Sequence, residues 1–207
     1  MGKSGRFGKY GEHKRMARLR NSGIREMKPG KKTRPGSSAD VRPYRRPSSE
    51  TEVLIREAQP SDAPFIQSLS KKAFGQYGPY EEMLPEWFLA GITLTLVAVQ
   101  GGVPVGFAML GIIHSDPLSV RESELVAIAV EPEAHRRGIG DRLMRNMIKA
   151  ADERCVERMH LHTAVDNLPA QTLFQKYGFS KARHKEKFYP KGQDALMMVR
   201  RAEWGSR

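Results

Sequence analysis

One junction, EAHRRGIGDRL at residues 133–143, constrains the fold more than any other stretch of the chain. An unbroken apolar run, SELVAIAV at 123–130, comes just before it, and an amphipathic pattern begins within it and continues to residue 154. These patterns predict a buried strand that turns directly into a helix. Glycine is unfavourable inside helices. Gly138 and Gly140 at the start of this helix therefore indicate that the backbone there has to stay accessible, without side chains over it.

An uncovered helix start is suited to an anion. Its first N–H groups have no partner within the helix, and they carry a partial positive charge. Arg136 and Arg137 add two cations beside the glycines. The sequence lacks GxxxxGK[ST], and no third glycine follows Gly140 to complete a dinucleotide fingerprint. The junction therefore predicts a diphosphate site of another kind.

The rest of the chain predicts a mixed α/β sheet with helices on both faces. Antiparallel N-terminal strands come first, and strand–helix–strand–helix–strand follows. Ser61 or Asp62 is expected to cap the first helix, and segment 76–91 reads as irregular to helical, broken by Pro79 and Pro85. The predicted strands and turns are VLI at 53–55, two strands in 93–113 around the turn 100–102, a turn at 116–120, and strands at 123–130, 159–165 and the end of 187–201. The predicted helices follow residue 62, span 138–154 and span 168–179, the last one ended by Gly178.

Charge divides the 207 residues into two parts. Residues 1–50 hold 15 Lys and Arg against four acidic residues, which is nearly all of the net charge of +12. This arm is rich in Gly, Pro and Ser and poor in branched apolar residues, so we expect disorder there and a folded domain over 51–203. The arm suits RNA or a ribosome. An anionic membrane surface and a plain solubilising tail remain alternatives.

The chain has one cysteine, Cys155, so it forms no internal disulfide and fits a reducing compartment. No apolar run approaches 18 residues, and the N-terminus lacks a secretory h-region. We therefore expect a cytoplasmic protein without a membrane span. His160 and His162 share a strand face, but the sequence offers no third ligand beside them, so no metal site is expected.

The segment VAIAVEPEAHRRGIGDRL followed by DNLPAQTLFQKYGF resembles the acyl-CoA-binding core of the GCN5-related N-acetyltransferases (GNAT). FYPKGQDALMM resembles the tail of the ribosomal-protein-alanine N-acetyltransferase branch. The resemblance implies acetyl-CoA as co-substrate and an amine as acceptor. It implies that the backbone of residues 128–130 pairs with the pantetheine arm, that residues 136–141 hold the pyrophosphate, and that Asn167 contacts the cofactor or caps its helix. The residues so implied are Ile128, Ala129, Val130, Arg136, Arg137, Gly138, Ile139, Gly140, Asp141, Asn167 and Phe174.

Two positions depart from the family pattern. His135 stands where the family has Gln or Arg, and Phe174 stands where many members have a Tyr that protonates the leaving thiolate. Phe has no proton to donate. Tyr189 and Tyr177 are the candidate replacements.

Two residues are candidate general bases. By resemblance, Glu124 matches the catalytic Glu of the histone-acetylating members, and His162 lies where the ribosomal-protein enzymes carry a Glu. Imidazole titrates near neutral pH and is suited to moving protons there. The sequence does not choose between the two.

The main functional hypothesis is acetyl transfer to a protein amine, either an N-terminal α-amine or a lysine. A second hypothesis takes a small amine as acceptor: a polyamine, an amino acid or an aminoglycoside. Glu81, Glu82 and Glu86 would supply the acidic pocket that such polycations need. A third hypothesis, a non-catalytic RNA-binding protein that senses acyl-CoA, depends on Phe174.

Overall fold

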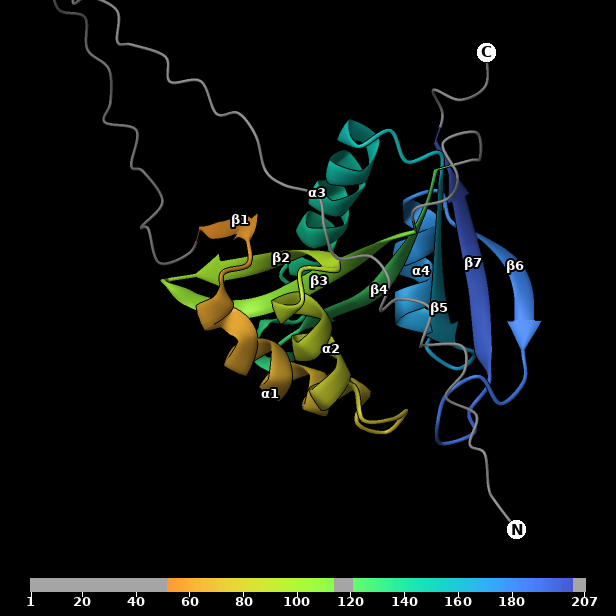
Figure 1. Ribbon diagram of the computed structural model, residues 1–207, viewed down its shortest axis with the longest axis horizontal. Helices are drawn as coiled ribbons and strands as arrows, with labels where there is room; N and C mark the ends of the chain where they lie inside the picture. The colour runs from red at the N-terminus through yellow and green to blue at the C-terminus, as the bar shows by residue number, and fades with distance from the viewer. Residues whose placement is uncertain (1–51, 114–120, 203–207) are drawn as a thin grey trace, which may run out of the picture.

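The computed structural model describes residues 52–113 and 121–202. These residues form one seven-stranded mixed sheet in the order β1-β2-β3-β4-β5-β7-β6, flanked by four α-helices (Figure 1). The elements in chain order are β1 Val53–Glu57, α1 Ala63–Phe74, α2 Tyr80–Leu89, β2 Thr93–Gln100, β3 Val103–Ile113, β4 Glu122–Val130, α3 Ile139–Glu153, β5 Arg158–Ala164, α4 Leu168–Lys176, β6 Ser180–Lys185 and β7 Ala195–Arg201. The predicted fold class is confirmed. The basic arm 1–50 and the turn predicted at 116–120 lie outside the described residues.

The first half of the sheet, β1 to β4, is antiparallel throughout. Gly101 and Gly102 join β2 to β3 with φ values of 57° and 79°. Two consecutive positive φ angles are the requirement of a tight hairpin turn, and glycine meets it without strain. The predicted turn at 100–102 is therefore confirmed.

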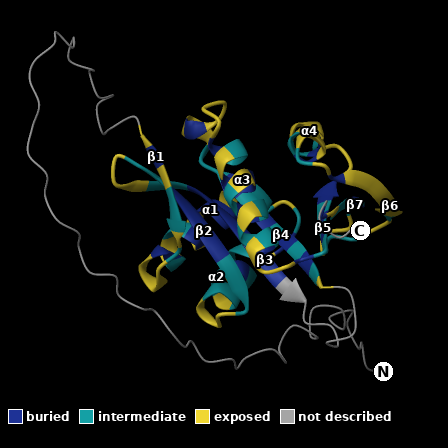
Figure 2. Ribbon diagram, turned by 90° about the horizontal axis from the view of Figure 1, so that it is seen from above, coloured by how far each residue is buried: buried dark blue, intermediate teal, exposed yellow. Residues whose placement is uncertain are grey.

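Two apolar cores lie on opposite faces of the sheet. One contains the buried side of α3, with Leu143, Met144 and Met147, and it extends to Phe174 of α4. The other packs α1 and α2 onto the opposite face of β2–β4. Figure 2 shows the buried stripe of α3 turned toward the strands and its exposed side turned outward. This arrangement follows from the apolar spacing of 3.6 residues per turn in the α3 sequence.

Two elements differ from the sequence prediction. Pro85 lies inside the ten-residue helix α2 and does not break it. The packing of α2 on α1 and the sheet compensates for the hydrogen bond that proline cannot donate. The second difference is β6, SKARHK, which the sequence analysis did not identify as a strand. Its first five residues are exposed at the sheet edge. Without a buried face it carries no apolar alternation, and its charges suit an edge strand.

Asp62 precedes α1 as expected, but its carboxylate does not cap that helix. It accepts instead a two-pronged ion pair from Arg56, at 2.7 and 2.9 Å, and a bond from the Gln59 N–H. Within residues 52–113 and 121–202, no helix combines the length and the apolar composition that crossing a bilayer requires.

Candidate active site

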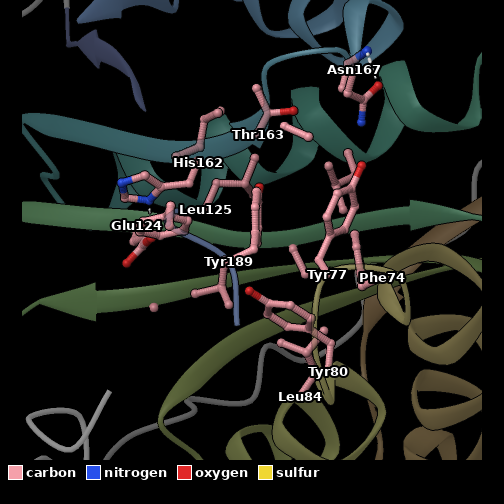
Figure 3. Close-up of a pocket in the computed structure, with 18 of the residues that line it drawn as sticks. Phe74, Tyr77, Tyr80, Leu84, Glu124, Leu125, His162, Thr163, Asn167 and Tyr189 are labelled. Atoms are coloured by element: carbon pink, nitrogen blue, oxygen red, sulfur yellow. Dashed lines mark hydrogen bonds and ion pairs between the residues drawn. The ribbon is translucent and has the colours of Figure 1, made fainter. Parts of the chain in front are cut away.

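A cleft lies between β4, β5, α4 and the α1–α2 region (Figure 3). Its volume is about 1060 Å³, including the part that is open to solvent. Most of its lining is apolar or aromatic. Among the described residues of the lining, Glu124 is the only one that carries a carboxylate. The predicted site residues on its wall are Glu124, Ile128, His162, Asn167, Phe174 and Tyr189.

The cleft exists because β4 and β5 separate. Their parallel pairing covers only Glu122–Leu125 with Arg158–Leu161. On the other side of β4, the register with β3 shifts at Val126, which has no partner there. A bulge of this kind bends a strand and increases its twist. The pairing of β4 with β5 thus ends at Leu125, just where the bulge begins. Beyond this point the two strands continue without pairing with each other.

The unpaired edge of β4 displays backbone groups from alternate residues. The Glu131 N–H donates to the Val105 carbonyl at 2.8 Å. Because bonded pairs recur at every second position of an antiparallel ladder, Ala129 also directs its N–H and C=O toward β3. Ile128 and Val130 direct theirs toward the gap. Of the three residues predicted to pair with the pantetheine arm, Ile128 and Val130 thus present backbone groups to the gap, whereas the backbone of Ala129 faces β3.

The junction between β4 and α3 has the geometry expected of an anion site. Gly138 precedes α3 with φ of 74°, and a Cβ built on it would meet nothing within 4 Å. Backbone conformation, and not crowding, is what requires glycine at this position. Arg136 also has a positive φ, 59°, and both Arg136 and Arg137 are exposed. The first N–H groups of α3 receive no side-chain cap, which leaves the backbone of Ile139, Gly140 and Asp141 available at the helix start.

Two side chains at the junction are engaged elsewhere. The His135 Nε2 lies 2.8 Å from the Val130 carbonyl oxygen and so joins the junction to the end of β4. The Asp141 carboxylate binds Lys176, and Arg145 at 3.1 Å; the Lys176 bond in particular lowers the pKa of Asp141. Asp141 therefore contributes only its N–H to an anion, because its own side chain is negative and already paired.

Glu124 and His162, the two candidate bases, are in direct contact. Glu124 Oε1 lies 2.9 Å from His162 Nδ1, and Oε2 lies 3.6 Å from His160 Nε2. Burial alone would raise the pKa of Glu124, but the contacts with His160 and His162 outweigh it and lower that pKa to about 2. An ionised carboxylate only accepts hydrogen bonds, so His162 carries its proton on Nδ1 and donates it to Glu124.

The other side of the His162 ring is also occupied. Lys185, at the end of β6, places its Nζ 2.8 Å from His162 Nε2. Phe188 stacks on the imidazole with centroids 4.3 Å apart and planes 17° apart, and the Lys185 Nζ lies 5.2 Å from the Phe188 ring centroid. A carboxylate, an imidazole and an ammonium group thus form one chain across β4, β5 and β6.

Aromatic side chains form the far end of the cleft. Tyr77 and Tyr189 lie against each other with ring centroids 4.6 Å apart, and Tyr80 is 6.5 Å from Tyr189 (Figure 3). Burial, with a smaller contribution from the charge of Asp166, raises the pKa of Tyr77. Its hydroxyl therefore stays protonated at neutral pH.

Two loops far apart in sequence are tied together beside these rings. Lys191 Nζ donates to the Gly75 carbonyl at 2.6 Å, and its N–H donates to the Tyr77 carbonyl at 3.2 Å. Gln193 Nε2 donates to the Gln76 carbonyl at 2.7 Å. We call residues 75–79 together with 188–193 the loop clamp. Its hydrogen bonds hold the two loops together beside the aromatic rings.

Three further predicted residues have definite positions. Asn167 accepts from the Ala170 N–H at 3.2 Å, so it caps α4 and also lines the cleft. Phe174 is 4% exposed and lines the cleft next to α4. Tyr177 is not among the cleft residues. Its O–H donates to the Asp141 backbone carbonyl at 2.8 Å, which removes it as a candidate proton donor.

The three acidic residues proposed to bind a polycation lie away from the described lining of the cleft. Glu81, Glu82 and Glu86 belong to α2, but none of them is among the described residues that line the cleft. In the described part of the chain, no group of three or more His, Cys, Asp or Glu side chains is arranged to hold a metal ion.

Sequence reasoning missed Lys185, Phe188 and Tyr77. The aromatic segments QYGPY and KFYP were visible, but an aromatic residue in isolation is more often core than ligand contact. What could have drawn attention to them is that both segments contain a proline or a glycine beside the ring. This combination is typical of ordered loops and not of core strands.

Comparison with known proteins agrees with the fold. Residues 61–179 match the model of the Acetyltransferase (GNAT) family. The chain belongs to this family, and it is accordingly an N-acetyltransferase.

Its relatives include enzymes that act on protein N-termini. The chain is 31% identical to an N-alpha-acetyltransferase of Sulfurisphaera tokodaii, over 72% of this chain and 92% of that protein. It is 28% identical to the ribosomal protein bS18-alanine N-acetyltransferase of Escherichia coli K12, over 51% of this chain and 70% of that protein. In fold it resembles a chain of the NatC complex solved with a Gag peptide and CoA: the TM-score is 0.63 at 18% identity, covering 73% of this chain and 99% of that one.

Proposed function

We propose that this enzyme transfers an acetyl group from acetyl-CoA to the α-amine of a protein N-terminus. The observation that carries the proposal is the contact of Glu124 with His162 on the wall of a cleft that opens where β4 and β5 part. His162, supported by Glu124, thereby faces the unpaired edge of β4, whose backbone N–H and C=O groups can bind a ligand.

The gap and the junction fit the two ends of coenzyme A. The Ile128 carbonyl and the Val130 N–H offer backbone groups to the pantetheine arm in the manner of an added strand, because the Val130 carbonyl is already bound by His135. The N-terminus of α3, with Arg136 and Arg137, offers N–H groups and positive charge to a pyrophosphate. Gly138 and Gly140 put no side chain between these N–H groups and an approaching anion.

The residues of this chain then divide the proton transfers. His162 takes the proton from the acceptor ammonium, and Glu124 orients the ring and stabilises the imidazolium that forms. The Ile128 N–H, which faces the gap, polarises the acetyl carbonyl. Tyr189 donates a proton to the departing sulfur. It takes the role of the tyrosine that many family members have at the position of Phe174.

The acceptor end favours an α-amine over a lysine. The ordinary pKa of an α-amine, about 8, lies about 2.5 units below that of a lysine. Removing its proton at neutral pH therefore costs roughly 3.4 kcal/mol less. The names of the Sulfurisphaera tokodaii and Escherichia coli relatives point to the same class of acceptor.

The test is an acceptor competition. Peptides with a free N-terminus and no lysine are compared with the same peptides N-blocked and carrying one lysine, with thiol release and mass spectrometry as readouts. We expect acetylation of the free N-terminus at least tenfold faster. Equal rates for both peptides, or acetylation of the lysine alone, would refute an α-amine specificity.

We further propose that residues 1–50 bring the enzyme to an RNA-bound substrate. Their 15 basic residues supply the charge that phosphate contacts require. Deleting the arm should leave the acetylation of a free peptide unchanged and slow that of the same N-terminus on an intact ribosome. Equal losses on both substrates would contradict this role.

A further inference from the structure

Lys185 holds a position that the proposed reaction needs for its substrate. Its ammonium group lies 2.8 Å from His162 Nε2 and 5.2 Å from the centroid of the Phe188 ring. A hydrogen bond to a base and a nearby aromatic ring are what an amine acceptor requires before it loses its proton. His162 and Phe188 both line the cleft. They therefore form a subsite for an ammonium group, and a side chain of the enzyme itself fills it.

With Lys185 in this position His162 cannot act as a base. Its Nδ1–H is donated to Glu124, and its Nε2 accepts from Lys185. Imidazole has only these two ring nitrogens, so no lone pair is left for a proton from the substrate. Catalysis through His162 requires the Lys185 ammonium to leave first.

The charges around the ring favour one ammonium group at a time. Glu124 faces His162 from β4, His160 lies beside it on β5, and Lys185 reaches it from β6. Glu124 is the single negative group in this set. Two ammonium groups at one imidazole would repel each other at close range, so the acceptor and Lys185 exclude one another.

Release of this contact requires movement of only one side chain at the edge of the sheet. Lys185 is the last residue of β6, an edge strand, and its side chain is only half-buried. A lysine side chain has four rotatable bonds and reaches water readily from such a position.

We infer that Lys185 occupies the acceptor's ammonium subsite in the resting enzyme and acts as an internal competitor of the substrate. The inference rests on the proposed function, because it identifies the atoms at which the acceptor amine of that reaction is held. It predicts that removing the lysine improves the enzyme.

The kinetic test compares Lys185→Met and Lys185→Arg with Lys181→Met in the full-length enzyme. Lys181 is an exposed lysine on the same strand, so its variant matches the loss of charge. We expect Lys185→Met to lower KM for the peptide and to raise kcat/KM about two- to tenfold, the factor typical of one hydrogen bond in water. Lys185→Arg keeps a cationic donor and should therefore not show this gain, whereas Lys181→Met should leave kcat/KM within twofold of the wild type. A fall or no change in Lys185→Met, with its melting temperature preserved, would overturn the inference.

A binding test separates this inference from the proposed function. Trimethylamine is protonated at neutral pH, has one N–H to donate and gives no stable amide. Titrated into the enzyme, it should shift the NMR signals of the His162 ring at lower concentration in Lys185→Met than in the wild type or in Lys181→Met. Equal titrations in all three proteins would overturn the subsite. If this shift occurs but no peptide is acetylated, the proposed function fails and the subsite remains.

Discussion

The division of work between Glu124 and His162 can be decided by comparing Glu124→Gln with His162→Ala. With a pKa of about 2, Glu124 would have to take a proton from an amine whose pKa is about 8, an uphill transfer of roughly 8 kcal/mol. The structure therefore favours His162 as the base, with Glu124 as its positioning partner.

We expect His162→Ala to lower kcat/KM for a peptide by about 10²- to 10⁴-fold, the usual contribution of a general base. Glu124→Gln should lower it by roughly tenfold, because the amide oxygen still accepts the Nδ1–H and only the charge is lost. The double variant should resemble His162→Ala, since two residues that act as one unit are not additive.

The assay is thiol release from acetyl-CoA with a lysine-free peptide, measured from pH 6 to pH 9. Melting temperatures of the variants separate misfolding from loss of catalysis. The reasoning is refuted if Glu124→Gln loses more activity than His162→Ala, or if the two losses multiply in the double variant.

Three other predictions follow from described residues. The pKa of Glu124 falls from 4.5 to about 2 on folding. Its ionisation therefore stabilises the fold by about 3 kcal/mol above pH 4.5 and loses this contribution as the pH falls toward 2; urea unfolding of Glu124→Gln should show a flatter pH dependence over that range. Gly138→Ala places a Cβ at φ of 74° and should raise KM for acetyl-CoA roughly tenfold, since left-handed backbone costs about 1–2 kcal/mol in a residue with a Cβ. Gly91→Ala, at φ of 68° and away from the cleft lining, should leave that KM unchanged. Tyr189→Phe should lower kcat by up to about 100-fold with little effect on KM, whereas Tyr177→Phe, which lies off the cleft, should leave kcat within threefold; equal effects of the two would contradict the role of Tyr189.

The sequence predicted most of the sheet because apolar spacing and turn glycines are local signals. The junction at 133–143 could be assigned to a strand, a turn and a helix start for the same reason. Each depends on residues within a few positions of each other. Pro85 shows the limit of such rules, since packing of α2 on α1 maintains a helix that a local rule would end.

The contacts across the site could not be predicted. Glu124 and His162 are 38 residues apart, and whether both side chains face one cleft depends on the register of β4 against β5. Lys185 was hidden for another reason: it belongs to an edge strand whose exposed residues show no alternation. Its approach to His162 depends on β6 pairing with β7, and β7 with β5.

The short parallel pairing of β4 with β5 has a consequence for the lifetime of the protein. Only four residue pairs join the two halves of the sheet at this point, so a molecule that bridges the gap acts as a missing strand. By mass action, a ligand at 100 times its Kd adds about 2.7 kcal/mol to the free energy of unfolding. Resistance to proteolysis should therefore rise and fall with the supply of that ligand.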